Sequence, residues 1–221
     1  MHLDTELARR NMVQQQVRCW DVGNPRVLHA LQTVPREHFV ADEYQSLAFA
    51  DTNLPLTRSS AQTMLKPQLE GRILQVLAPQ ADERVLEIGT GSGYLTACLA
   101  RLAKSVTSID VSGECVATAT ARIRDLGISN CDIREQDVYE RSEADTFDVI
   151  AVTGSIHAYD PRFEQWLNSG GRAFVVIGTP PAMEACLITR MEDGVMVDSL
   201  FETVMAPLAL PGGTAAASFH F

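Results

Sequence analysis

The sequence has no excess of positive charge. Its 221 residues carry 18 Lys and Arg against 28 Asp and Glu, a formal net charge of −10. Sequence-independent binding to nucleic acid usually needs clustered Lys and Arg, so we expect no nucleic-acid partner. No apolar run reaches membrane-spanning length, and residues 1–20 hold Asp4, Glu6, Arg9 and Arg10 among scattered apolar side chains, unlike a secretory signal. We expect no membrane partner and a cytoplasmic location.

Cysteine and histidine patterns with a chemical meaning are also missing. The five cysteines form no C-x-x-C pair, which favours free thiols in a reducing compartment. The five histidines have no ligand spacing, so no metal site is expected. There is no G-x-S-x-G segment, which excludes the usual serine nucleophile of a hydrolase. The sequence leaves the oligomeric state open, a monomer included.

Strand and helix patterns alternate from Arg84 onward. We expect strands at 84–88, 105–110, 131–136, 147–152, 172–177, 183–190 and 195–205, with helices at 92–103, 112–126 and 160–168. This alternation predicts an α/β fold with a doubly wound, mostly parallel sheet. The last two strands have no helix-length connection, so they are expected to form an antiparallel hairpin.

The residues before this alternation read as a helical extension. Apolar periodicity predicts helices at 4–18, 26–33 and 68–77, while 41–66 is rich in turn formers and is expected to be an irregular loop. We therefore divide the chain into a helical and loop region at 1–80, which packs on the core and forms the acceptor side, and a cofactor-binding core at 81–208. The stretch from Pro207 is low in complexity and is expected to be mobile, and 209–221 is predicted to be a flexible tail.

The most informative segment runs from Val85 to Tyr94 and reads V-L-E-I-G-T-G-S-G-Y. A strand, a glycine turn and a helix start of this kind open a βαβ unit whose loop backbone can approach a ligand closely. The spacing is G-x-G-x-G, and an acid at Glu87 disfavours a pyrophosphate but favours a ligand with cationic groups, such as S-adenosylmethionine (SAM). The cofactor-binding residues expected here are Glu87, Gly89, Thr90, Gly91, Ser92 and Gly93.

Two further acids follow the next two strands. Asp110 comes twenty-one residues after Gly89, where a carboxylate can accept both ribose hydroxyls. Asp137 follows the third strand and could receive an adenine amine, although a helix cap explains it equally well. NAD(H) is the competing cofactor, and the glycine spacing and Glu87 weigh against it.

Several segments form a recognisable set: residues 34–40 read V-P-R-E-H-F-V, 48–51 read A-F-A-D, 54–56 read L-P-L, 61–63 read A-Q-T and 86–94 read L-E-I-G-T-G-S-G-Y. With these segments the chain resembles the protein-L-isoaspartate O-methyltransferase family, in family order from about Arg9 to Leu208. The resemblance implies a Rossmann-like, SAM-dependent enzyme that methylates the carboxylate of isoaspartyl residues in proteins or peptides as a step of repair. A carboxylate is ionised at neutral pH, so no general base is expected.

One departure lies at the acceptor site. The family pattern is G-Q-T-I-S, whose serine hydroxyl contacts the acceptor carboxylate, and this chain has Thr63-Met64-Leu65 at its end. Leucine donates no hydrogen bond. Thr63, Ser59, Ser60 and Lys66 are the candidates to compensate, and Thr63 and Leu65 mark the expected catalytic position.

Three hypotheses remain open from the sequence. The first is an isoaspartyl methyltransferase. The second is a methyltransferase for another carboxylate or a small apolar-edged acid, favoured by Met64 and Leu65. The third is a SAM-binding module without catalysis. After the fourth strand the chain reads V-T-G-S at 152–155 and lacks the Asn-Pro-Pro-aromatic signature of enzymes that methylate base amines.

Overall fold

The structure, a computed structural model, describes residues 5–57, 62–141 and 145–208. Its main sheet has seven strands in the order β5-β4-β3-β6-β7-β8-β9. The strands are β3 (Arg84–Ile88), β4 (Ser105–Asp110), β5 (Cys131–Glu135), β6 (Phe147–Ile156), β7 (Leu167–Thr179), β8 (Ala182–Met191) and β9 (Gly194–Glu202). All seven correspond to predicted strands.

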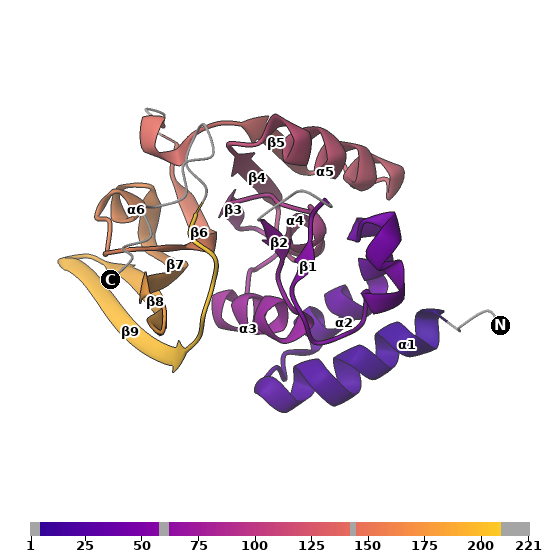
Figure 1. The fold of residues 1–221 in the computed structure, drawn as a ribbon. Helices are drawn as coiled ribbons and strands as arrows, with labels where there is room; N and C mark the ends of the chain where they lie inside the picture. Colours follow the sequence, from indigo (N-terminus) through magenta and orange to yellow (C-terminus); the bar gives the residue numbers. More distant parts are fainter. Residues whose placement is uncertain (1–4, 58–61, 142–144, 209–221) are drawn as a thin grey trace, which may run out of the picture.

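The sheet is parallel from β5 to β7 and antiparallel from β7 to β9. The predicted α/β class, with its C-terminal antiparallel hairpin, is therefore confirmed. Figure 1 shows the N-terminal helices gathered beside the sheet and the β8–β9 hairpin on the other side of the molecule. The chain steps outward from β3 to β4 and β5, then returns to β6 on the other flank of β3. A crevice forms at such a reversal, at the carboxyl ends of the strands.

Alternation of side chains along the strands builds two cores. In β3, Val85 packs with a cluster that includes helical residues such as Leu74 and Leu99, whereas Leu86 packs with Phe163 and other residues of the opposite face. A central parallel strand is buried on both faces, and β3 accordingly has almost no exposed residue. These two cores hold the carboxyl end of β3 in a fixed place.

The helices agree with the sequence prediction at most positions. The principal helices are α1 (Thr5–Met12), α2 (Pro25–Thr33), α3 (Pro67–Leu77), α4 (Tyr94–Leu102) and α5 (Gly113–Asp125). After α1 the chain continues through a π-helical turn, Val13–Val17, and a 3-10 turn, Arg18–Trp20. Asn24 caps α2, since its side chain accepts a hydrogen bond from the Arg26 N–H at 2.9 Å.

Two predictions about local structure were wrong. The helix expected at 160–168 shrinks to α6 (Arg162–Gln165), because β7 already begins at Leu167. The stretch 41–66 is not an irregular loop throughout: its described part forms a 3-10 helix at Asp42–Leu47 and a small hairpin of β1 (Leu54–Pro55) and β2 (Thr63–Met64). Two-residue strands are too short for periodicity to reveal. Residues 209–221, the predicted tail, lie outside the described residues.

Candidate functional site

The glycine loop after β3 forms the floor of a cavity at the carboxyl ends of the strands. Gly89, Gly91 and Gly93 all have positive φ, at 98°, 51° and 84°. A Cβ at Gly89 would lie 2.2 Å from Thr153 Oγ1, and one at Gly93 would lie 2.8 Å from the Ala119 Cβ. At Gly91 it would meet only a Leu56 methyl, at 3.7 Å. Two of the glycines therefore allow close packing, and all three allow a backbone that other residues rarely adopt.

Asp110 links the end of β4 to this loop. Its Oδ2 accepts a hydrogen bond from the Gly91 N–H and its Oδ1 accepts one from the Ser112 N–H, both at 2.9 Å. The residue is 7% exposed and lines the cavity. Each carboxylate oxygen keeps acceptor capacity after these contacts, so the group is held in place and can still bind a pair of hydroxyls.

Glu87 is fully buried directly behind the loop. Its Oε2 accepts hydrogen bonds from the Thr96 hydroxyl and from Ser108 Oγ, the latter at 2.6 Å. Ser108 in turn lies 2.6 Å from Thr90 Oγ1, and the Thr90 hydroxyl is the donor because the Ser108 hydrogen is already committed. The second oxygen, Oε1, is buried without a partner. A buried acceptor that lacks a donor at a cavity is suited to a cationic ligand group.

Burial raises the pKa of Glu87 to about 8, against the two hydroxyl donors that lower it. The carboxylates of Asp110 and Glu70 raise it further. A positive charge in the adjoining part of the cavity would favour the ionised form of Glu87. Glu70, like Glu87, lines that part.

Glu70 belongs to a buried ion pair that the sequence did not reveal. Its partner is Arg36, whose guanidinium also donates to the carbonyl of Ala48 at 2.8 Å and of Leu65 at 2.7 Å. Burial raises the pKa of Glu70 to about 7, and the Arg36 charge opposes the rise. Arg36 also lies over the Tyr94 ring at 4.9 Å. The pair thus joins the wall of the cavity to the backbone at Leu65. The V-P-R-E segment contains Arg36, but the sequence analysis gave that residue no role, and no pattern marked Glu70.

Asp137 does not line the cavity. Its Oδ1 accepts a hydrogen bond from the Tyr139 N–H at 2.9 Å and caps the 3-10 helix Val138–Glu140. Its neighbours Gln136 and Val138 do line the cavity. The helix-cap interpretation of Asp137 therefore has a hydrogen bond behind it, while its contact with a cofactor stays a prediction.

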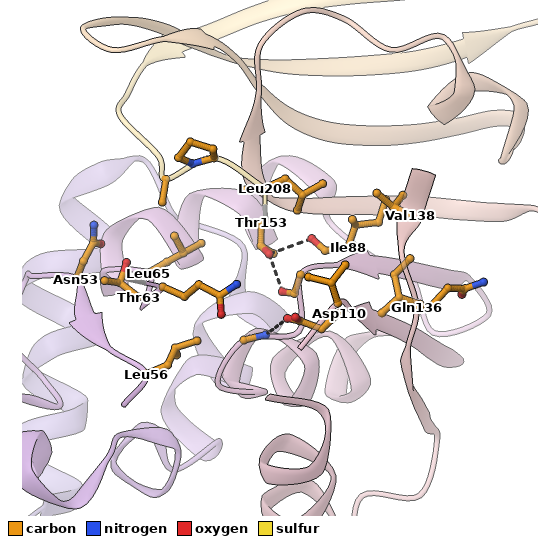
Figure 2. A pocket seen from close by; sticks show the side chains of 18 residues that line it. Asn53, Leu56, Thr63, Leu65, Ile88, Asp110, Gln136, Val138, Thr153 and Leu208 are labelled. Atoms are coloured by element: carbon orange, nitrogen blue, oxygen red, sulfur yellow. Dashed lines mark hydrogen bonds between the residues drawn. The ribbon is translucent and has the colours of Figure 1, made fainter. Parts of the chain in front are cut away.

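The β1–β2 hairpin supplies the opposite wall. Thr63 and Leu65 both line the cavity, together with Asn53 and Leu56. Figure 2 shows these four residues on one side and Asp110, Gln136 and Val138 on the other, with Thr153 between them. Of the other candidates near Leu65, Ser59 and Ser60 lie outside the described residues.

The end of β6 and the segment after β9 complete the enclosure. Ser155 N donates to the Ala206 carbonyl at 2.8 Å, Ser155 Oγ donates to the Met205 carbonyl at 3.0 Å, and Leu208 N donates to the Ser155 carbonyl at 2.9 Å. Gly154 has no room for a Cβ, which would lie 2.6 Å from the Leu208 Cα. Residues 206–208 therefore form a fixed wall of the cavity. The expectation that the chain is mobile from Pro207 was therefore wrong for Pro207 and Leu208, which are held against Ser155 at the end of β6.

Thr153 is another residue that the sequence analysis missed. Its hydroxyl lies 2.6 Å from the Gly89 carbonyl and 3.0 Å from the Ile88 carbonyl, so it ties β6 to the glycine loop. Its place at the end of the fourth parallel strand was the available signal.

Other kinds of site find no support within 5–57, 62–141 and 145–208. This part of the chain contains no cluster of three or more metal-ligating side chains. It also contains no helix long and apolar enough to cross a membrane. All five cysteines are free thiols: Cys98 and Cys186 are buried, Cys115 and Cys131 are half-buried, and Cys19 is exposed.

Comparison with solved structures defines the class of protein. A Plasmodium falciparum structure, described as a protein-L-isoaspartate O-methyltransferase in complex with S-adenosyl-L-homocysteine, superposes with a TM-score of 0.80 over 90% of this chain and 97% of that one, at 20% identity. The fold is that of a Rossmann-like methyltransferase.

Sequence comparison defines the family. The model of the protein-L-isoaspartate(D-aspartate) O-methyltransferase family matches residues 8–209, and the chain belongs to this family. The protein-L-isoaspartate O-methyltransferase of Koribacter versatilis is 33% identical over 85% of this chain and 84% of its own length. That of a Picosynechococcus species is 38% identical over 79% of this chain and 78% of its own length.

Proposed function

We propose that the protein is a SAM-dependent O-methyltransferase that methylates isoaspartyl carboxylates in proteins or peptides. The observation that carries the proposal is one cavity with two chemically different walls. Asp110 and the glycine loop form one wall, and the hairpin residues Thr63 and Leu65 form the other. Family membership supports the same activity. Its role would be a step of protein repair in the cytoplasm.

The residues of the first wall fit SAM. Asp110 would accept the ribose hydroxyls, and the unpartnered Oε1 of Glu87 lies behind the loop where an ammonium group would complete it. The positive φ of Gly91 and the lack of a side chain there would let the loop backbone approach the ligand. Thr90, Ser92 and the other two glycines hold the loop in shape. Asp137 lies between the cavity residues Gln136 and Val138, and it would shape their part of the cavity through its cap of Val138–Glu140.

Methyl transfer to a carboxylate requires few functional groups from the second wall. SAM supplies a methyl group on a positively charged sulfur. An acceptor carboxylate is already ionised at neutral pH, so the protein needs no base and has to orient one oxygen and exclude water. The described residues that line the cavity include no Lys, Arg or His, so only neutral donors such as the Thr63 hydroxyl face the acceptor. We assign this acceptor side to the segment up to residue 80, completed by residues 206–208, and the cofactor side to the rest of 81–208.

A direct assay tests the proposal. The protein is incubated with methyl-labelled SAM and an isoaspartyl peptide, beside the same peptide with a normal aspartyl residue. Label is expected on the isoaspartyl peptide, together with S-adenosylhomocysteine in equal amount. Tight SAM binding, with no S-adenosylhomocysteine formed in the presence of any carboxylate acceptor, would instead favour a SAM-binding module.

A second candidate function keeps the transfer and changes the acceptor. Leu56, Leu65, Pro207 and Leu208 give the cavity apolar side chains next to the expected transfer position. Such a rim favours another carboxylate or a small acid with an apolar edge. Label on such acids, with none on the isoaspartyl peptide, would establish this alternative.

A further inference from the structure

The acceptor wall has to provide hydrogen-bond donors for a negatively charged carboxylate. An ionised carboxylate loses its water donors on entering a cavity and needs hydrogen-bond donors from the protein. Leu65 has none. The cation next to it, Lys66, lies with its Nζ 5.3 Å from the centre of the Trp20 ring and is not among the residues that line the cavity. The donor is therefore expected from another residue of the acceptor wall.

The register of the hairpin points to Asn53. The paired residues are Leu54 with Met64 and Pro55 with Thr63. Extended by one residue beyond these pairs, the same register would bring Asn53 opposite Leu65, and the hydrogen bond from the Lys66 N–H to Asn53 Oδ1 fits this placement. Side chains at directly opposed positions of an antiparallel pair lie within about 5 Å of each other at Cβ. Figure 2 shows Asn53, Thr63 and Leu65 on the same side of the cavity.

The side-chain amide of Asn53 has a defined orientation. Its Oδ1 accepts a hydrogen bond from the Lys66 backbone N–H at 3.1 Å. A backbone N–H can only donate, so the oxygen of the amide must face Lys66 and the NH2 group must face away from it. No hydrogen bond from that NH2 group occurs within the described residues, so both of its hydrogens are available to a ligand.

We propose that Asn53 recognises the carboxylate of the acceptor by donating from its side-chain NH2 group, in place of a hydroxyl at position 65. The proposal rests on the proposed function and names the residue that sets its specificity. The NH2 group has two hydrogens. One would be donated to the carboxylate oxygen that does not receive the methyl group, and the other to a neighbouring carbonyl of the acceptor peptide. The Thr63 hydroxyl lies on the same wall.

The kinetic signature follows from the charge. The acceptor carboxylate carries its full negative charge when it binds and loses that charge as the new O–C bond forms. A donor to this group is therefore strongest before transfer, and its loss raises KM more than it lowers kcat. A hydrogen bond to a charged group corresponds to about a ten- to hundredfold change.

The experiment compares Asn53→Ala, Leu65→Ser and the double variant with the parent protein. Methyl transfer to an isoaspartyl peptide gives kcat and KM, and calorimetry with S-adenosylhomocysteine gives cofactor affinity. Gln45→Ala is the matched control, because it removes an exposed amide from the neighbouring 3-10 helix, outside the cavity. Asn53→Ser checks the fold, since its hydroxyl can still accept from the Lys66 N–H.

We expect Asn53→Ala to raise KM about ten- to hundredfold with cofactor affinity unchanged, and Leu65→Ser to restore most of the loss in the double variant. A merely structural role of Asn53 would not be rescued by a serine at 65. Unchanged KM in Asn53→Ala, or a loss that Leu65→Ser does not reverse, would overturn the proposal while leaving the proposed function intact. No turnover by the parent protein would overturn both.

Discussion

The two walls of the cavity are built in different ways. The cofactor wall comes from consecutive residues, Glu87 to Gly93, and from Asp110 at the end of the adjacent strand, all held between two buried cores. The acceptor wall combines a hairpin of two-residue strands with residues 206–208, which are far apart along the chain. The side chains of the first wall belong to the central sheet and its two cores, so substitutions there disturb the sheet. The side chains of the second wall can be substituted without disturbing it.

This difference explains where the chain departs from the pattern of its family. Leu65 replaces a hydroxyl on the hairpin, where its backbone carbonyl remains fixed by Arg36 at 2.7 Å. The backbone position is therefore kept while the side chain changes. We infer that specificity varies on the acceptor wall and that cofactor binding does not.

The largest effect is expected at Gly89. Gly89→Ala introduces a Cβ 2.2 Å from Thr153 Oγ1 at a φ of 98°. Backbone strain and the contact together correspond to about 3 kcal/mol, or about a hundredfold weaker binding of S-adenosylhomocysteine in calorimetry. Gly23→Ala is the control, because nothing lies within 4 Å of its Cβ position. Equal affinities for the two variants would contradict the close-packed loop.

Alanine substitutions of Asp110 and Asp137 should have clearly different effects on cofactor affinity. Asp110→Ala removes a carboxylate that holds the Gly91 N–H and lines the cavity, so cofactor affinity should fall about ten- to hundredfold. Asp137→Ala removes only a helix cap, and its affinity should stay within about threefold of the parent. Equal losses, measured in the same titration, would show that Asp137 contacts the cofactor directly.

Glu87 gives the cofactor wall a pH dependence. Its pKa is raised from 4.5 to about 8 by burial, so between these values the folded protein holds a proton that the unfolded chain has lost. The contribution of Glu87 to stability is therefore fully present at low pH and falls as pH rises, by up to about 1.4 kcal/mol per pH unit. In urea unfolding of the ligand-free protein from pH 5.5 to 7.5, Glu87→Gln should lose this slope. A parent protein whose stability relative to Glu87→Gln does not fall across this range would contradict the assignment.

A smaller change, and a gain, is expected at Leu65. Leu65→Ser adds a second donor beside Asn53, and isoaspartyl kcat/KM should rise about threefold to tenfold, with cofactor affinity unchanged. Initial rates with peptide and calorimetry with S-adenosylhomocysteine measure the two quantities. A serine that leaves the rate unchanged would mean that position 65 does not contact the acceptor.

The sequence predicted the cofactor wall well because its residues are local. Glycine spacing, Glu87 and the strand end at Asp110 follow from short patterns and from the rule that ligands bind at the carboxyl ends of parallel strands. Asn53 and Glu70 could not be found in this way. Asn53 matters through a register set by a two-residue strand, and Glu70 matters through a contact with Arg36, thirty-four residues earlier. Neither relation has a periodic signature.

The central claim is that both walls serve one methyl transfer to an isoaspartyl carboxylate. The most direct measurement is the ratio of kcat/KM for an isoaspartyl peptide to that for the same peptide with a normal aspartyl residue. Mass spectrometry of the product locates the methyl group. The account predicts a ratio far above one, with the methyl group on the free α-carboxylate of the isoaspartyl residue alone. Equal rates on the two peptides, or methylation elsewhere, would contradict it.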